Sequence, residues 1–441
     1  MRKTSTIFAA LIATLLLSAC LPGLPGLPAL PSTLSPDAIA TAVAATVSAG
    51  APAAPSVAAP TVAATPAAPS PAGPLRISYV DTGRNLWVWT EGSLPQQLTF
   101  SGDVLFSRMS PDSSRIAFLR SADFTNQNLY VIRSDGSGEL LLLSAADFAA
   151  LPRTDPAALT LNINQLEWIP RSNRLAFSTR LVFDGPGLIL NRDLWVIDTD
   201  TATRTNLLPP GSGGMFTYSP DGSQIALSSP TSVSLLNADG SNLRMNVLTY
   251  PFINTASEYA FHVMPTWRSD SGALRAVVPP EEPFAIPTPN SMVWNLPVDG
   301  SPAGSMGFIV NSFLNAAPFS PDLSRLAYLR PSGGSGNISE LHIVNLDGGG
   351  DLNVATSTYD QIYWSPDSSR LLVSASDPGG LYLVDTAGGM TTLTPIGRVL
   401  DARWVAPDKF AYITDEGGGW ELRLYNGGTI SIIAFLAGPG S

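Results

Sequence analysis

Few side chains in this sequence are grouped as catalytic or metal-binding residues usually are. The two histidines, His262 and His342, lie far apart, and no His-Glu-x-x-His or paired-cysteine pattern occurs, so we expect no metal site. His342 stands in an apolar run, where a hydrogen-bonded structural role is expected. Glu281 and Glu282 could in principle exchange protons, but the prolines around them are typical of a solvated loop.

Two other patterns that could indicate an enzyme have simpler interpretations. The string Gly-Gly-Ser-Gly-Asn at 333–337 differs at its fifth position from the Gly-x-Ser-x-Gly elbow of serine hydrolases and falls in a loop. Asp198 and Asp200 lack the glycine and the closing glutamate of a calcium loop, so we expect them to form a turn. The sequence therefore predicts a protein that is not an enzyme and has no cofactor.

The composition indicates that any site must be positioned by strands and turns. The chain has 441 residues, of which 44% are hydrophobic and 13% are charged, about half the usual ~25%. Ser, Thr, Asn, Gly and Pro supply the polar surface, and they favour turns and strands over long helices. The formal net charge is -11 and no basic stripe is visible, so nucleic acid is not an expected partner.

The N-terminus has the layout of a secretory signal. Arg2 and Lys3 precede an apolar run at 7–17, and small residues follow up to Cys20, the single cysteine. The ending Leu-Ser-Ala-Cys at 17–20 resembles the bacterial lipobox, which implies cleavage before Cys20 and acylation of that residue. An ordinary signal peptide with a chance cysteine is the alternative. We expect residues 1–19 to be a lipoprotein signal peptide, and the protein to lie outside the cytoplasm, anchored to a membrane of the bacterial envelope through Cys20.

Residues 20–74 are predicted to be a disordered tether. They contain twelve prolines and one charged residue, Asp37, and such a segment cannot bury a core. The folded domain is expected over 75–441.

A repeat organises this domain. The stretch 363-YWSPDSSRLLVSAS-376 has counterparts at 106–120, 216–229 and 317–330, and weaker ones at 166–180, 265–278 and 402–415. Successive copies are 41 to 59 positions apart, a spacing typical of repeat architectures.

Each copy reads as two β-hairpins. Ser-Pro-Asp has the residues that a type I turn favours, and the proline ends the preceding strand. Asp-Gly pairs, as at 135–136 and 299–300, predict the second hairpin. The strands are apolar on both faces, which requires each four-stranded antiparallel sheet to have neighbours on both sides. Sheets arranged radially around an axis meet this requirement, so the predicted fold is an all-β propeller.

The pattern resembles the WD-like propeller repeat of TolB-type proteins and of the non-catalytic domain of prolyl-oligopeptidase relatives. The resemblance covers about 75–435 and implies an interaction module of the cell envelope. It does not extend to peptidase activity, because no residues remain for the separate catalytic domain. Seven full units follow a partial unit over 76–100, which favours eight blades, with the missing strand supplied near 436–441 or absent. Seven blades with a packed N-terminal extension is the alternative.

Long insertions mark one face of the predicted propeller as the binding face. They fall at 145–163, 181–192, 249–263, 279–291 and 331–339, in connections that share one end of the strands. The candidate binding residues on these insertions are Phe183, Tyr250, Tyr259, His262, Glu281, Glu282 and Phe284. Aromatic residues are good interface anchors, and the alternative is that these side chains pack the insertions onto the blades.

We therefore predict a lipid-anchored module that binds another protein or an envelope polymer. The alternatives are an envelope enzyme or a solute-binding lipoprotein that uses the axial channel for glycans or small molecules.

Overall fold

The fold is that of a computed structural model, and all that follows concerns the second of the chain's two units, Ala64–Ser441. The structure describes residues 73–436 apart from 185–188, 258, 288, 311–317, 333–337, 348–349, 377–378, 395–396 and 416–418. The predicted signal peptide, Cys20 and nearly all of the predicted tether lie outside these residues.

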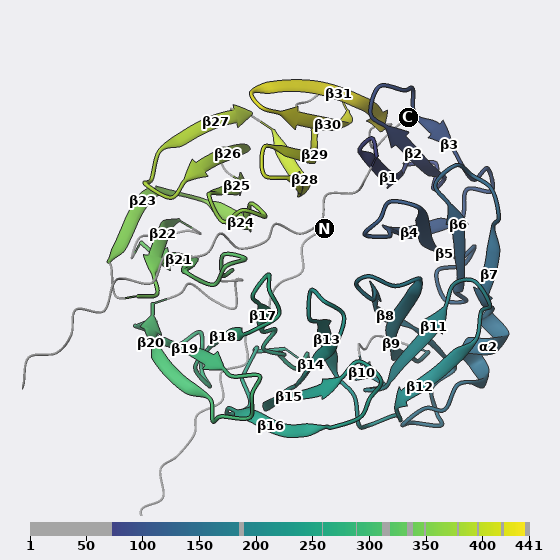
Figure 1. The fold of residues 1–441 in the computed structure, drawn as a ribbon, viewed down its shortest axis with the longest axis horizontal. Coiled ribbons are helices and arrows are strands. Elements are labelled where there is room, and N and C mark those ends of the chain that lie inside the picture. Colours follow the sequence, from purple (N-terminus) through teal and green to yellow (C-terminus); the bar gives the residue numbers. More distant parts are fainter. Residues whose placement is uncertain are drawn as a thin grey trace, which may run out of the picture. The chain divides into compact units, whose positions relative to one another are not determined.

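Eight antiparallel sheets follow one another in chain order around a ring (Figure 1). We number them as blades 1 to 8. Blade 1 contains β1 (Arg76–Val80), β2 (Leu86–Thr90) and β3 (Gln96–Gln97). Blade 2 contains β4 (Val104–Met109), β5 (Arg115–Arg120), β6 (Asn128–Arg133) and β7 (Leu140–Leu143). Blade 3 contains β8 (Thr160–Trp168), β9 (Arg174–Val182), β10 (Ile189–Leu190), β11 (Leu194–Asp198) and β12 (Arg204–Leu208). Blade 4 contains β13 (Met215–Tyr218), β14 (Gln224–Ser229), β15 (Ser232–Asn237) and β16 (Arg244–Thr249).

The second half of the chain continues the pattern. Blade 5 contains β17 (Thr266–Trp267), β18 (Leu274–Val278), β19 (Ser291–Leu296) and β20 (Gly304–Ile309). Blade 6 contains β21 (Arg325–Pro331), β22 (Ser339–Asn345) and β23 (Asp351–Ser357), with a bridge between Phe319 and Leu326 in place of a first strand. Blade 7 contains β24 (Tyr359–Trp364), β25 (Arg370–Ser376), β26 (Gly379–Asp385) and β27 (Met390–Thr394). Blade 8 contains β28 (Arg398–Ala406), β29 (Lys409–Asp415), β30 (Trp420–Asn426) and β31 (Thr429–Leu436).

The structure confirms the predicted all-β propeller with eight blades. A single short helix, α2 (Ala145–Ala150), accompanies the strands within the described ranges. No helix in this part of the chain has the length and apolar character needed to span a membrane.

The Ser-Pro-Asp motif forms the turn between the first and second strands of a blade. In blade 7 the Ser365 hydroxyl donates to Asp367 Oδ1 at 2.6 Å, and that carboxylate accepts from the Ser369 hydroxyl at 2.8 Å. Ser368, the fourth residue of the turn, has a φ of 63°, and Gly222 has a φ of 76° at the same position of blade 4. The motif aspartates therefore stabilise turns, as the sequence predicts.

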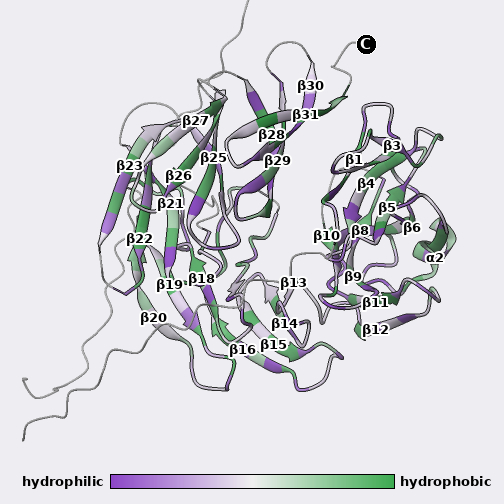
Figure 2. Ribbon diagram, turned by 45° about the horizontal axis from the view of Figure 1, so that its top comes forward, coloured by the Kyte–Doolittle hydropathy of each residue, from purple (hydrophilic) through white to green (hydrophobic). Residues whose placement is uncertain are grey.

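Hydrophobic cores lie between the blades, one at every boundary of the ring, and together they form eight clusters. Figure 2 shows the hydrophobic segments that the strands contribute. The ring is closed by the cluster between blades 8 and 1, where Leu422 and Ile433 pack with Tyr79. Lys409 Nζ lies 3.0 Å from Glu91 Oε1 across the same boundary.

Tryptophans join the innermost strands of neighbouring blades. The indole of Trp364 in β24 donates to the carbonyl of Pro318 in blade 6 at 2.9 Å. Three further indoles make the same contact with the preceding blade: Trp168 to Arg108 O at 2.9 Å, Trp267 to Thr217 O at 3.2 Å, and Trp404 to Tyr363 O at 3.1 Å. These contacts explain why tryptophan precedes or lies near the turn in several repeats.

Blade 1 has no first strand within the described residues. The strand that ends at Leu436, β31, pairs with β30 as the fourth strand of blade 8, so it does not supply one. Residues 437–441, where a missing strand was also expected, lie outside the described part of the chain. Since β1–β2–β3 form a sheet of their own between blades 8 and 2, the alternative of seven blades is wrong.

Candidate binding face

The long connections all lie at the same end of the strands. Those between β9 and β11, β18 and β19, and β21 and β22 join the second and third strands of a blade. Those between β7 and β8 and between β16 and β17 lead from one blade to the next. The tight Ser-Pro-Asp turns lie at the other end, so the insertions share one face, as the sequence predicts.

Two pairs of insertions are held together by an asparagine. In blade 3, Asn191 Oδ1 accepts from Thr154 N at 2.9 Å, and its Nδ2 donates to Pro152 O at 3.1 Å. In blade 5, Asn254 N donates to Glu281 O at 2.8 Å, and its Nδ2 donates to Glu282 Oε2 at 3.1 Å. Each pair is therefore one structured surface.

We call the second surface the blade 5 loop pair. It comprises the described residues of 250–265, between β16 and β17, and of 279–290, between β18 and β19. Five large apolar side chains are exposed on it: Phe252 by 54%, Tyr259 by 45%, Met264 by 41%, Phe284 by 36% and Ile286 by 99%. Glu281 and Glu282 are exposed beside them. The loop pair thus presents apolar anchors with polar groups beside them, and interfaces commonly have such an apolar centre with a polar rim.

Tyr250 and His262 pack this surface onto the propeller. Tyr250 is buried, its hydroxyl donates to Ser229 O at 2.7 Å, and the same oxygen accepts from Val263 N at 3.2 Å. For Tyr250 the structure therefore shows the alternative, in which the side chain packs the insertion onto the blade. His262 is half-buried with Nδ1 3.1 Å from Ala260 O, and burial lowers its pKa, which favours the neutral imidazole.

Phe183 lies apart from the blade 5 loop pair. It is partly buried against the core between blades 2 and 3. Of the seven predicted binding residues, four lie exposed on the blade 5 loop pair: Tyr259, Glu281, Glu282 and Phe284.

Sequence reasoning missed three apolar residues of the loop pair, Phe252, Met264 and Ile286. A single apolar residue in a loop usually predicts packing, not exposure. The signal that could have found Ile286 is the run 283-PFAIPTP-289, in which prolines exclude pairing in a sheet and leave no strand to bury the apolar side chains.

His342 occupies a polar cluster in blade 6. It is 4% exposed, with Nδ1 3.0 Å from Asp351 Oδ1 and Nε2 3.2 Å from Glu340 Oε2. The Tyr328 hydroxyl donates to Asp351 Oδ2 at 2.6 Å, and burial together with this carboxylate raises the pKa of Tyr328. The predicted hydrogen-bonded histidine is confirmed, and both of its ring nitrogens are occupied.

One cleft inside the ring has few acidic groups among the described residues that line it. A cleft of about 390 Å³ opens between blades 8, 1 and 2, and Asp401 is the one carboxylate among the described residues that line it. Asp401 Oδ2 lies 3.1 Å from Arg403 Nε. The described ranges contain no group of three His, Cys, Asp or Glu residues able to hold a metal ion. Converging acids, which would favour an enzyme, are therefore not seen in this cleft.

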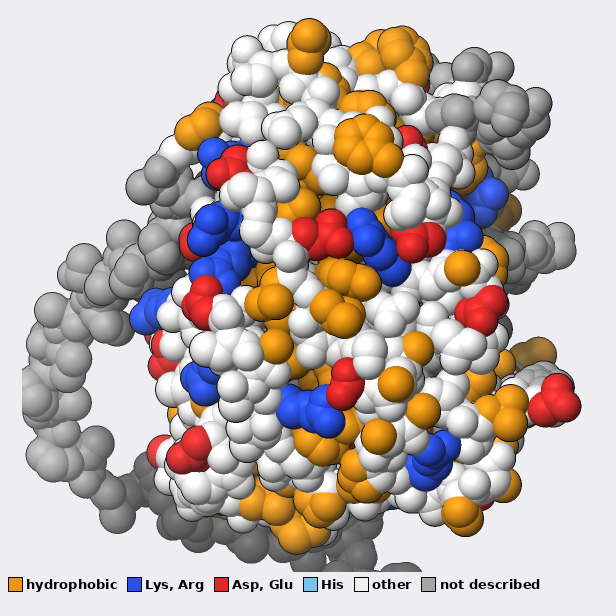
Figure 3. Space-filling model, turned by 90° about the vertical axis from the view of Figure 1, so that its right-hand side faces the viewer, with side chains coloured by type: hydrophobic (Ala, Val, Ile, Leu, Met, Phe, Trp, Pro, Cys, Tyr) orange, Lys and Arg blue, Asp and Glu red, His pale blue; other side chains and the backbone are white. Residues whose placement is uncertain are grey.

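Several charged side chains form ion pairs at the surface. Figure 3 shows one side of the ring, where acidic and basic side chains neighbour one another and no basic stripe crosses the surface. Arg204 Nη1 to Asp147 Oδ1, at 3.0 Å, is one such pair.

Comparisons with known proteins found similar solved structures but no family. No protein-family model matches the chain, and no curated protein is detectably similar in sequence. Solved structures that are similar include other propellers. Oligogalacturonate lyase in complex with manganese is 14% identical, with a TM-score of 0.46, over 71% of this chain and 97% of that one. The β-propeller domain of the Trilobed protease from Pyrococcus furiosus is 10% identical, with a TM-score of 0.47, over 76% and 99%. A putative TolB from Agrobacterium tumefaciens is 15% identical, with a TM-score of 0.33, over 56% and 89%.

Proposed function

We propose that this protein is a lipid-anchored extracytoplasmic β-propeller that binds another protein through the blade 5 loop pair. The observation that carries the proposal is the set of five large apolar side chains exposed on two loops that Asn254 ties together. Exposed apolar groups that are held in place lose little entropy on binding, so they are suited to anchor a partner.

The chemistry of the loop pair favours a protein over a polymer. Phe252 and Ile286 present flat or branched apolar surface, which packs against apolar side chains of a partner. The exposed carboxylates of Glu281 and Glu282 would contact basic groups at the rim. We therefore expect a partner with an apolar patch flanked by Lys or Arg. The membrane anchor rests on the lipobox-like Cys20, and the tether would hold the propeller at a distance from the membrane.

The test is in-cell crosslinking of the full-length protein followed by mass spectrometry. The variant Phe252→Asp/Ile286→Asp places two charges in the apolar surface. Both positions are exposed, so the variant should still fold. The matched control is Leu94→Asp, because Leu94 is 88% exposed in the connection between β2 and β3, at the other end of the strands. Thermal melts would establish that all three proteins are folded.

We expect one specific protein to be captured by the wild type and by Leu94→Asp, and to be lost from the double variant. If the folded double variant captures the same partner to the same extent, the blade 5 loop pair is not the binding surface. If an envelope polymer is recovered in place of a protein, the choice of partner is wrong.

A further inference from the structure

The inner edge of β1 in blade 1 pairs with no other strand of the described residues. Binding through the blade 5 loop pair does not involve this edge. In blade 2 the Arg at the start of the second strand reaches a turn of the next blade, since Arg115 donates to Thr199 Oγ1 at 2.8 Å. Arg76, at the start of β1, makes the equivalent contacts with Ser113 O at 3.3 Å and Ser134 Oγ at 3.1 Å in blade 2. Thus β1 is the second strand of its blade, and the place of the first strand is on its inner side.

The backbone of β1 shows which groups face that place. Glu91 N donates to Leu75 O at 2.8 Å and Asp81 N donates to Asn85 O at 3.0 Å, so odd-numbered residues bond to β2. In an antiparallel ladder the groups alternate from one side to the other. The N–H and C=O groups of Arg76, Ser78 and Val80 therefore point towards the open edge, where no strand of the described chain pairs with them.

A cleft lies along this edge. Its volume is about 390 Å³, and its walls are β1, β4 of blade 2, and β28 and β29 of blade 8. Figure 1 shows β1 lying between β28 and β4 around the ring. Leu105, Val405 and Ile413 supply apolar wall, and the charged lining consists of Arg76, Arg108, Arg403 and Asp401. The lining thus carries three positive charges and one negative, although the whole chain has a net charge of -11. Glu167 lies 3.3 Å from Arg108, so the arginines are still in excess by one when this neighbour is counted.

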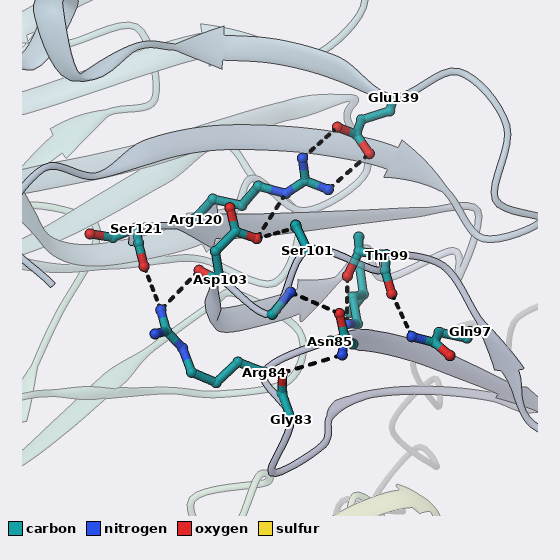
Figure 4. A network of polar contacts seen from close by, with 12 residues as sticks. Gly83, Arg84, Asn85, Gln97, Thr99, Ser101, Asp103, Arg120, Ser121 and Glu139 are labelled. Carbon is teal, nitrogen blue, oxygen red and sulfur yellow. Dashed lines mark hydrogen bonds and ion pairs between the residues drawn. The ribbon is translucent and has the colours of Figure 1, made fainter. Parts of the chain in front are cut away.

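The three described strands of blade 1 are held in place by contacts with the blades on both sides. Towards blade 2, Arg84 donates to Asp103 O at 3.1 Å and to Ser121 O, and Asn85 Oδ1 accepts from Gly102 N at 3.0 Å (Figure 4). Towards blade 8, Lys409 pairs with Glu91. These contacts fix the walls, so the cleft is preorganised for a ligand.

We propose that this cleft binds an extended acidic segment of a partner protein, which adds to β1 as the first strand of blade 1. Strand addition at an open edge is an established mode of peptide recognition, in which backbone hydrogen bonds give affinity and alternate side chains give specificity. The segment would run antiparallel to β1, with apolar residues on the face towards one neighbouring blade and a carboxylate on the other face, near Arg403 or Arg108. This site is separate from the blade 5 loop pair and does not depend on it.

The chain's own flanking sequences are less suited to this edge. Residues 61–72 carry no charge, and Pro66, Pro69 and Pro71 have no N–H to donate. Residues 437–441 read Ala-Gly-Pro-Gly-Ser and offer little side chain to the apolar walls. The excess of arginine in the lining favours an acidic ligand from another protein.

The experiment measures binding of a defined peptide to the full-length protein by fluorescence anisotropy. The probe is a labelled Thr-Val-Glu-Val-Thr-Val-Glu peptide, and its control has alternate backbone nitrogens methylated on the edge that would pair with β1. We expect saturable binding, weakened about tenfold or more by methylation, because several backbone hydrogen bonds are lost. Arg403→Glu, at an exposed side chain, should weaken binding of the unmethylated probe about fivefold or more.

Variants at Ser78 test the edge itself. Its N–H faces the cleft and is not used by β2, so Ser78→Pro should weaken binding at least as much as methylation. The control Leu94→Asp, at an exposed side chain in the connection between β2 and β3, should leave binding unchanged. Arg403→Glu and the methylated peptide keep the test decisive if Ser78→Pro does not fold. The proposal is overturned if the probe shows no binding, or if the methylated and unmethylated peptides bind equally. It is also overturned if replacing 61–72 by Gly and Ser tightens binding about tenfold, since the tether would then be the occupant.

Discussion

Removing the indole N–H of one tryptophan that bonds to the preceding blade should lower the free energy of unfolding measurably. Trp364 is 8% exposed and donates to Pro318 O at 2.9 Å across a blade boundary. In Trp364→Phe the aromatic ring remains but the carbonyl loses its partner, which costs about 1–3 kcal/mol. Some packing is lost as well, so we expect the free energy of unfolding to fall by about 2–3 kcal/mol.

The matched control is Trp420→Phe. Trp420 is partly buried in the cluster between blades 8 and 1, and its indole N–H has no acceptor in the described chain. The same change therefore removes volume but no hydrogen bond, and it should cost about 1 kcal/mol or less. The difference between the two variants isolates the contact between blades.

Calorimetric melts of the two variants and the wild type provide the assay. Unfolding entropy is about 2.1 cal/mol/K per residue, so a folded domain of roughly 350 residues has ~0.7 kcal/mol/K. A loss of about 2–3 kcal/mol then lowers the Tm by about 3–4 °C, and the control should shift by about 1 °C. Equal shifts in the two variants would show that the indole contacts do not stabilise the ring.

Two further predictions concern the thermal stability at low pH and the membrane attachment through Cys20. Burial acts to raise the pKa of the turn carboxyls, but hydrogen bonds from neighbouring serines outweigh it and hold the pKa of Asp112, Asp221, Asp322 and Asp367 below the usual 3.8. A lowered folded-state pKa contributes stability above the unfolded value of about 3.9, and that stability is lost as the pH falls through the folded-state pKa. The Tm measured between pH 6 and 2 should therefore drop below pH 4, and a flat profile there would contradict this. Separately, Cys20→Ser should move the protein from the membrane fraction to the soluble extracytoplasmic fraction and abolish labelling by a fatty-acid analogue; unchanged membrane attachment would refute lipidation.

The architecture could be predicted because its determinants are local. Ser365, Asp367 and Ser369 are within five positions of one another and make the turn by themselves. The strands on both sides are apolar on both faces, so each sheet requires two neighbours. Repetition of this unit then predicts a ring, which the eight boundary clusters confirm.

The exposure of the loop residues could not be predicted in the same way. Tyr250 is buried because its hydroxyl reaches Ser229 O, 21 positions earlier in the chain. Ile286 is 99% exposed, although isoleucine is one of the residue types most often buried in a core. The burial of Tyr250 depends on this contact with a distant part of the chain, which no local pattern in the sequence contains. For Ile286 the neighbouring prolines are a local signal, but an isoleucine in a loop usually predicts packing.

How the ring closes is the part of the fold that the sequence pattern could not predict. The repeat predicts the strands but not which strand edges pair with another strand. The three-stranded unit at the start of the domain was therefore compatible with a ring of eight blades and with a ring of seven blades plus a packed extension. In the structure the side chains of blades 8 and 1 close the ring by packing, with Tyr79 against Leu422 and Ile433. Within the described residues no strand pairs with the inner edge of β1. A propeller closed in this way does not need the missing strand to hold its ends together, so occupation of the edge can serve binding without deciding whether the domain folds.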